Sequence, residues 1–154
     1  MTRLDAELDE APLDHDGAPG PVAELLDARE VPLGGVRGIT VHRTLPQRAL
    51  PMVGAWCFLD RFDHESAVMR VLPHPHIGLQ TVTWPIDGDI RHRDSVGSDV
   101  VVAPGQLNMM TAGHGISHSE LSIPEEPAEM HGLQLWTALP APSAHVAPFF
   151  EQHT

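Results

Sequence analysis

Apolar and polar residues alternate over short stretches of this chain, and Pro, Gly and Asp separate the stretches. A period of two residues is typical of a strand with one buried face. No long amphipathic helix is visible. We expect strands at residues 36–43, 56–59, 79–84, 90–94, 100–103, 107–110 and 133–139. Many short strands at this spacing predict an all-β protein with a barrel or jelly roll.

The connections follow from the turn residues. Asp87-Gly88-Asp89 is a turn signal, and it predicts that residues 90–94 return as the hairpin partner of residues 79–84. We expect loops at residues 63–70 and 122–129 and beyond Pro140. The 15 Pro and 13 Gly suit a protein with many turns.

The length of 154 residues suits one domain, which we place at residues 21–154. Residues 1–20 are acidic and poor in apolar side chains, so we expect a flexible arm. The net charge of −12 disfavours binding to nucleic acids and to anionic membranes. The single cysteine, Cys57, permits no intramolecular disulfide. With no apolar run at the start and none long enough to span a membrane, we expect a cytoplasmic protein.

Two short pairs of residues stand out as candidate metal ligands. They are His74-Pro75-His76 and His118-Ser119-Glu120. Residues two apart in a strand point to the same face, so two facing strands would direct three imidazoles and one carboxylate into one volume. Such a set suits a divalent transition metal and leaves about two octahedral positions open.

Other interpretations of these histidines remain. The chain has 11 His, so the pairs could belong to a histidine-rich surface. A structural zinc site is a second interpretation, although closed zinc sites usually include Cys. His92 and Asp94 form a third pair, as alternative ligands or as a hydrogen-bonded surface pair. His114 precedes the second pair in a glycine-rich bend, either beside the site or exposed to solvent.

Three segments together resemble, in order and spacing, the signature of the pirin family. They are His74-Pro75-His76-x-Gly78-x-Gln80, His92-Arg93-Asp94-Ser95-x-Gly97 and Met110-Thr111-Ala112-Gly113-x-Gly115-Ile116-x-His118-Ser119-Glu120. The resemblance covers roughly residues 31–150. It implies a cupin fold, a double-stranded β-helix of jelly-roll type.

The resemblance also implies a function. The iron-binding residues of pirins fall on His74, His76, His118 and Glu120, which implies Fe²⁺, with Ni, Mn, Cu or Zn as alternatives. Some pirins are quercetin 2,3-dioxygenases, which open a flavonol ring with O₂ and release carbon monoxide. In such a reaction a small aromatic chelating substrate would bind the metal, and Glu120 would also accept the substrate's hydroxyl proton.

The chain departs from the family pattern at several points. Gln80 stands where pirins commonly have Glu, and His114 where they often have Arg or Lys; we expect both near the pocket. Pirins normally have two cupin domains, and this chain corresponds to the first. The face that packs on a second cupin would then be exposed, which predicts a homodimer or poor solubility. Other hypotheses are an iron-dependent redox sensor that binds a protein partner and a truncated remnant of a bicupin.

Overall fold

The structure, a computed structural model, describes residues 25–33 and 39–154, so the expected arm at residues 1–20 lies outside the described residues. The described part contains eleven strands and a short 3₁₀ helix, η2. The elements are β1 (Arg29–Leu33), β2 (Ile39–Leu45), β3 (Trp56–Ala67), β4 (Arg70–His76), β5 (Leu79–Asp87), β6 (Asp89–Asp94), β7 (Asp99–Val102), β8 (Leu107–Thr111), β9 (Ile116–Ile123), β10 (Ala128–Ala138), η2 (Ala141–Ser143) and β11 (Phe149–His153). Within these residues no helix is long and apolar enough to cross a membrane. The all-β class is confirmed.

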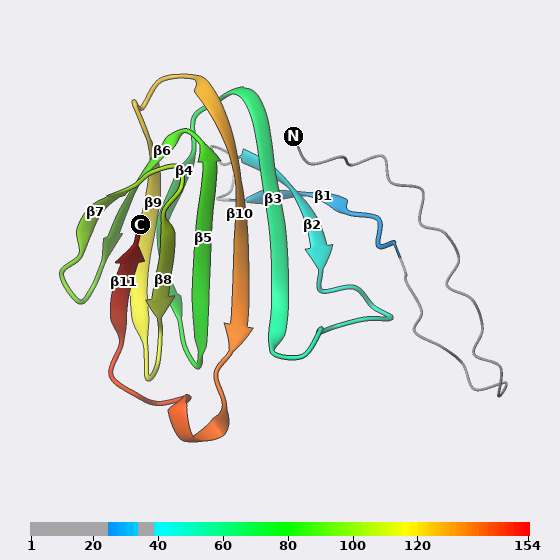
Figure 1. Cartoon of the computed structure of the whole chain (residues 1–154), viewed down its shortest axis with the longest axis vertical. Coiled ribbons are helices and arrows are strands. Elements are labelled where there is room, and N and C mark those ends of the chain that lie inside the picture. The colour runs from blue at the N-terminus through cyan, green and yellow to red at the C-terminus, as the bar shows by residue number, and fades with distance from the viewer. Residues whose placement is uncertain (1–24, 34–38) are drawn as a thin grey trace, which may run out of the picture.

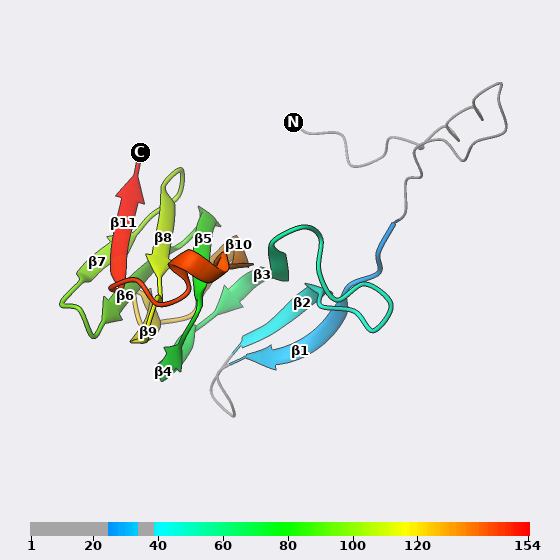
Figure 2. The same ribbon diagram turned by 90° about the horizontal axis from the view of Figure 1, so that it is seen from below.

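The strands form two antiparallel sheets. The larger sheet has seven strands in the order β1-β2-β3-β10-β5-β8-β11, and the smaller has four in the order β4-β9-β6-β7. Figure 1 shows β3, β10 and β5 of the larger sheet side by side. Figure 2 shows β1 and β2 extending to one side of the remaining strands. Strands that are close in sequence therefore often belong to different sheets.

The main hydrophobic core lies between the two sheets. The larger sheet contributes Ile39, Val41, Phe62 and Met130, and the smaller contributes Val71, Ile90 and Val102, with Met69 just before β4. Each of these side chains is almost fully buried. A satellite cluster of Met110, Ala112 and Ile116 packs against Phe150 of β11. This packing fixes the two sheets face to face and sets the spacing of the side chains between them.

Three sequence-based expectations about the strands are wrong. Residues 63–67 continue β3 instead of forming a loop, because the polar outer residues of this strand pair with β10. Strand β6 pairs with β7 and β9, not with β5, so the turn at Gly88 passes from one sheet to the other. Beyond Pro140 the chain forms β11, which pairs with β8.

Candidate metal centre

The two predicted ligand pairs lie on neighbouring strands of the smaller sheet. His74 and His76 belong to β4, and His118 and Glu120 belong to β9. The strands run antiparallel, with His74 directly opposite His118. The two strands are thus neighbours in one sheet, whereas the sequence suggested strands that face each other. We call His74, His76, His118 and Glu120 the His/Glu cluster.

The three imidazoles of the cluster converge through their Nε2 atoms. The Nε2 of His118 lies 3.1 Å from the Nε2 of His74 and 3.1 Å from the Nε2 of His76. Two nitrogens bound to one metal at about 2.1 Å lie about 3.0 Å apart when they occupy adjacent octahedral positions, and about 3.4 Å apart at a tetrahedral angle. The observed spacing is therefore closer to the octahedral arrangement.

A backbone carbonyl orients one of these rings. The Nδ1 of His74 donates to the carbonyl oxygen of Leu72 at 2.9 Å. A neutral imidazole with its proton on Nδ1 has a lone pair on Nε2. Metal-binding histidines are commonly held in this way by a hydrogen bond from the other ring nitrogen.

Burial keeps the other two rings neutral. Burial, with a smaller contribution from the neighbouring His74, lowers the pKa of His118 to about 2 and that of His76 to about 4. Neutral imidazole is the form that binds metals. The ring of His76 also packs edge-on against Trp136, with the centroids 4.9 Å apart.

Glu120 lies near the middle of β9 and lines the same cavity as the three histidines. Its carboxylate also groups with His118 and His92, whose possible ligand atoms all lie within 4.8 Å of one another. Burial raises the pKa of Glu120 to about 7, and a hydrogen bond with the Thr83 hydroxyl opposes the rise. The Thr83 hydroxyl also lies 2.8 Å from the side-chain oxygen of Gln134. A carboxyl group with this pKa can gain or lose its proton at neutral pH.

The cluster lines a small cavity of about 30 Å³ between the two sheets. The other lining residues are Leu33, Phe58, Asp60, Val71, Gln134 and Trp136. The space fits a single ion or a single water, since one water occupies about 30 Å³ in the liquid. The sequence did not single out Gln134, although residues 132, 134 and 136 share one face of β10.

His92 and Asp94 form a buried pair next to the cluster. The side chains are 4% and 0% exposed, so the surface interpretation is wrong. The Nε2 of His92 lies 3.1 Å from Asp94, and its Nδ1 lies 3.5 Å from the Nδ1 of His118. Burial lowers the pKa of His92 despite the opposing effect of Asp94. Burial would raise the pKa of Asp94, but hydrogen bonds from Ser98, His92 and Val96 lower it overall.

The two further pocket candidates lie outside this cavity's lining. His114 is exposed in the bend between β8 and β9, where its backbone N–H donates to the carbonyl of Val146. Gln80 is half-buried on β5 and donates to the hydroxyl of Thr111 at 2.9 Å. Their role near a bound substrate stays a prediction.

Two antiparallel sheets around three convergent histidines and a buried glutamate define a cupin with a candidate metal centre. The family model described as Pirin matches residues 38–137. The chain belongs to the pirin family, as its three sequence segments indicated.

Similar proteins support this assignment. A Pseudomonas aeruginosa protein, whose name gives quercetin 2,3-dioxygenase as a provisional activity, is 51% identical over 130 residues, 82% of this chain and 40% of that protein. A crystal structure of quercetin 2,3-dioxygenase from Acinetobacter baumannii matches with a TM-score of 0.73 and 42% identity, covering 82% of this chain and 43% of that one. This chain therefore spans less than half the length of either protein.

A more distant structure has the same fold. It is a bacterial pirin from Escherichia coli in complex with nickel(II), with a TM-score of 0.65 and 23% identity. The match covers 79% of this chain and 56% of that one.

Proposed function

We propose that the protein is a metal-dependent dioxygenase that acts on flavonol-like chelating substrates. The observation that supports this most directly is the convergence of three imidazole Nε2 atoms, two pairs of which are 3.1 Å apart. In this proposal the ligands are His74, His76, His118 and Glu120. A bound divalent metal would supply Lewis-acid and redox chemistry at the positions that the protein leaves open.

The donor set favours Fe²⁺. Three imidazoles suit Fe, Cu, Ni and Zn, whereas the carboxylate of Glu120 shifts the preference toward Fe, Mn and Ni. Separations of 3.1 Å agree with adjacent octahedral positions, which disfavours a closed tetrahedral zinc site. The nickel(II) complex of the E. coli pirin makes Ni²⁺ the main alternative.

A second hollow next to the cluster offers room for the substrate rings. The cavity of about 30 Å³ is too small for a flavonol. A larger open hollow of about 660 Å³ shares His76 with it. Its other lining residues are Pro75, Ile77, Leu79, Ser95, Gly115, Ile116 and Ser117. This volume lies in the range of small-molecule sites, and the mostly apolar lining suits aromatic rings.

Glu120 is the proposed base. A flavonol must lose its hydroxyl proton to bind as an anion, and a carboxylate inside the cavity is placed to accept it. A base works best when its pKa lies near the operating pH. The pKa of about 7 for Glu120 meets this condition in the metal-free protein.

We expect metal binding to weaken as the pH falls below 7. The metal must displace the proton of Glu120, whose pKa is about 7, so each further pH unit lowers the apparent affinity by about tenfold through this group. The Glu120→Gln protein should bind the metal more weakly at pH 7.5. Its apparent affinity should depend less steeply on pH, because metal binding then releases about one proton fewer. Titration calorimetry with Ni²⁺ between pH 6 and pH 8 measures both slopes. Equal slopes would contradict this role of Glu120.

Turnover tests the enzymatic claim. We expect the protein, reconstituted anaerobically with Fe²⁺, to bleach quercetin when O₂ is admitted and to release carbon monoxide. Absorbance and gas analysis give the two readouts, and the metal-free protein is the control. Bound metal at one equivalent without loss of quercetin would reject the dioxygenase and favour the redox-sensing hypothesis.

A further inference from the structure

The buried pair of His92 and Asp94 makes no contact that the proposed reaction requires, yet it touches the centre of the cluster. Within the cluster, His92 contacts His118 through the nitrogen that faces away from His74 and His76, and it lies within 4.8 Å of Glu120. We infer that Asp94 and His92 are positioning residues that fix the tautomer of His118 and thereby direct its Nε2 lone pair at the metal. This inference rests on the proposed metal site.

The carboxylate of Asp94 is held in one orientation. Its Oδ1 accepts hydrogen bonds from the backbone N–H groups of Val96 at 3.0 Å and Ser98 at 2.9 Å. Its Oδ2 lies 3.1 Å from the Nε2 of His92. An ionised carboxylate only accepts hydrogen bonds, so the proton of this contact belongs to His92.

The Asp94 contact determines which ring nitrogen carries the proton in His92 and then in His118. A neutral imidazole has one donor nitrogen and one acceptor nitrogen. Since His92 donates through Nε2, its Nδ1 accepts, and the Nδ1 of His118 lies 3.5 Å away. His118 therefore carries its proton on Nδ1, and its Nε2 is free to bind the metal.

A strand that sequence analysis missed holds His92 in place. Phe150 of β11 stacks on the imidazole, with the ring centroids 4.4 Å apart and the planes inclined by 23°. The aromatic ring excludes water on that side, so the hydrogen bonds of His92 have no solvent competitor there. The C-terminal strand thereby contributes to the orientation of a ligand on β9.

Asp94→Asn should move the proton of His92, and that of His118, to the other ring nitrogen. The two backbone N–H groups keep the amide oxygen at the Oδ1 position, so the amide nitrogen faces His92 and donates to its Nε2. His92 then carries its proton on Nδ1, and His118 must accept there and hold its own proton on Nε2. We expect Ni²⁺ affinity to fall by about 10- to 100-fold, as for other residues that orient metal ligands.

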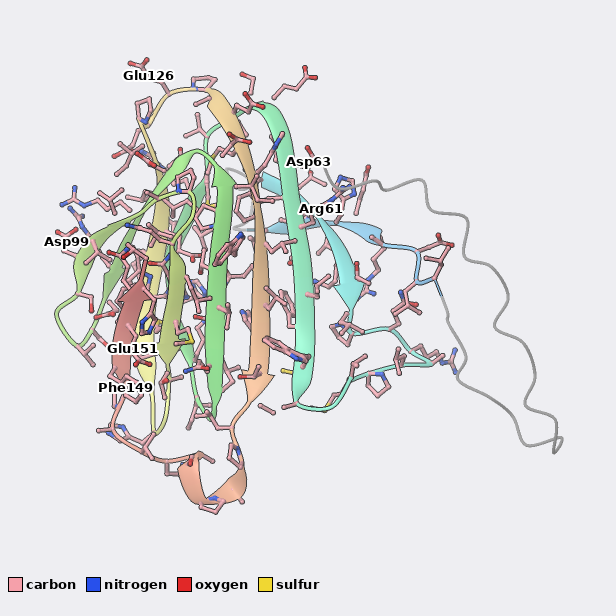
Figure 3. The ribbon with its side chains drawn as sticks, in the orientation of Figure 1. Arg61, Asp63, Asp99, Glu126, Phe149 and Glu151 are labelled. Carbon is pink, nitrogen blue, oxygen red and sulfur yellow. The ribbon has the colours of Figure 1, made fainter. Side chains whose placement is uncertain are left out.

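Asp99→Asn is the matched control. It removes a carboxylate from the same β6–β7 hairpin, but Asp99 is about half exposed and pairs with Arg91 and Arg93. Figure 3 shows Asp99 at the outer edge of the hairpin. We expect the Ni²⁺ affinity of this variant to match the wild type, because exposed ion pairs contribute little.

Imidazole ¹⁵N spectra of the metal-free proteins separate this inference from the proposed function. We expect the Nδ1–H tautomer of His118 in the wild type and in Asp99→Asn, and the Nε2–H tautomer in Asp94→Asn. An unchanged tautomer, or affinities of the two variants within threefold, would overturn the inference. A wild type that binds no Ni²⁺ would overturn the proposed function, and the tautomers would still decide which ring nitrogen of His118 carries the proton.

A second pair of variants applies if Asp94→Asn does not fold. The amide of His92→Gln can donate to Asp94 and accept from His118, whereas His92→Leu can do neither. We expect the Gln variant to bind Ni²⁺ at least about tenfold more tightly than the Leu variant. Equal affinities would overturn the inference. A metal bound by His92 itself, seen as a fourth imidazole in the absorption spectrum of the loaded protein, would also overturn it.

Discussion

The His118→Ala protein is expected to bind Fe²⁺ or Ni²⁺ more than about 100-fold more weakly than the wild type. His118 takes part in both of the 3.1 Å nitrogen pairs, so its loss removes the ligand between His74 and His76. Removing a residue that only orients a ligand costs about 10- to 100-fold in affinity, and loss of the ligand itself must cost more. Titration calorimetry and elemental analysis after dialysis measure the change.

His131→Ala is the control for this experiment. His131 belongs to a separate group of possible ligands, with Asp87 and Glu129, but these carboxylates are exposed and the histidine is half-buried. Its Nε2 also lies 3.0 Å from a carboxylate oxygen of Asp63 on β3. We expect the His131→Ala protein to keep one equivalent of metal and both variants to keep the circular dichroism of the wild type. Loss of metal from His131→Ala, with His118→Ala unaffected, would place the site elsewhere.

Gly113→Ala is expected to destabilise the fold by about 3 kcal/mol or more. Gly113 has a φ of +50°, a conformation that costs other residues about 1–2 kcal/mol. An added Cβ would also collide with the backbone carbonyl of Val146, whose carbon lies 2.9 Å from the Cβ position. Neither group can move freely, because the Val146 oxygen accepts a hydrogen bond from the N–H of His114 at 3.0 Å. Thermal unfolding of the metal-free protein should show a loss of about 10 °C.

Gly54→Ala separates the two contributions to this loss. Gly54 has a similar φ of +58°, but nothing lies within 4 Å of an added Cβ. We expect it to cost only the backbone strain, about 1–2 kcal/mol. If both substitutions lowered the melting temperature equally, the contact between Gly113 and Val146 would have no structural role.

The cluster could be predicted from local spacing because alternation in a strand is a local property. His74 and His76 share one face of β4, as His118 and Glu120 do on β9, and the antiparallel pairing brings the two faces together. The family pattern supplied the fold. The expected contact with a second cupin, and a homodimer through that face, stay predictions.

The features that the sequence did not predict depend on contacts between distant parts of the chain. The turn at Gly88 predicted a hairpin, but only the sheet order shows that it passes between sheets. His92 looked like a surface residue because the turn after it is polar, whereas Phe150, far away in sequence, covers its ring. The raised pKa of Glu120 could not be predicted from the sequence, because it arises from burial between the two sheets.

The position of the metal in a crystal of the Fe²⁺- or Ni²⁺-loaded protein decides whether the His/Glu cluster is the metal site. Anomalous diffraction at the absorption edge of the metal would locate it independently of the protein density. We expect one peak in the cavity between the sheets, within about 2.1 Å of the Nε2 atoms of His74, His76 and His118, and bound by Glu120. A peak beside His131, or one bound by His92 in place of the His/Glu cluster, would contradict it.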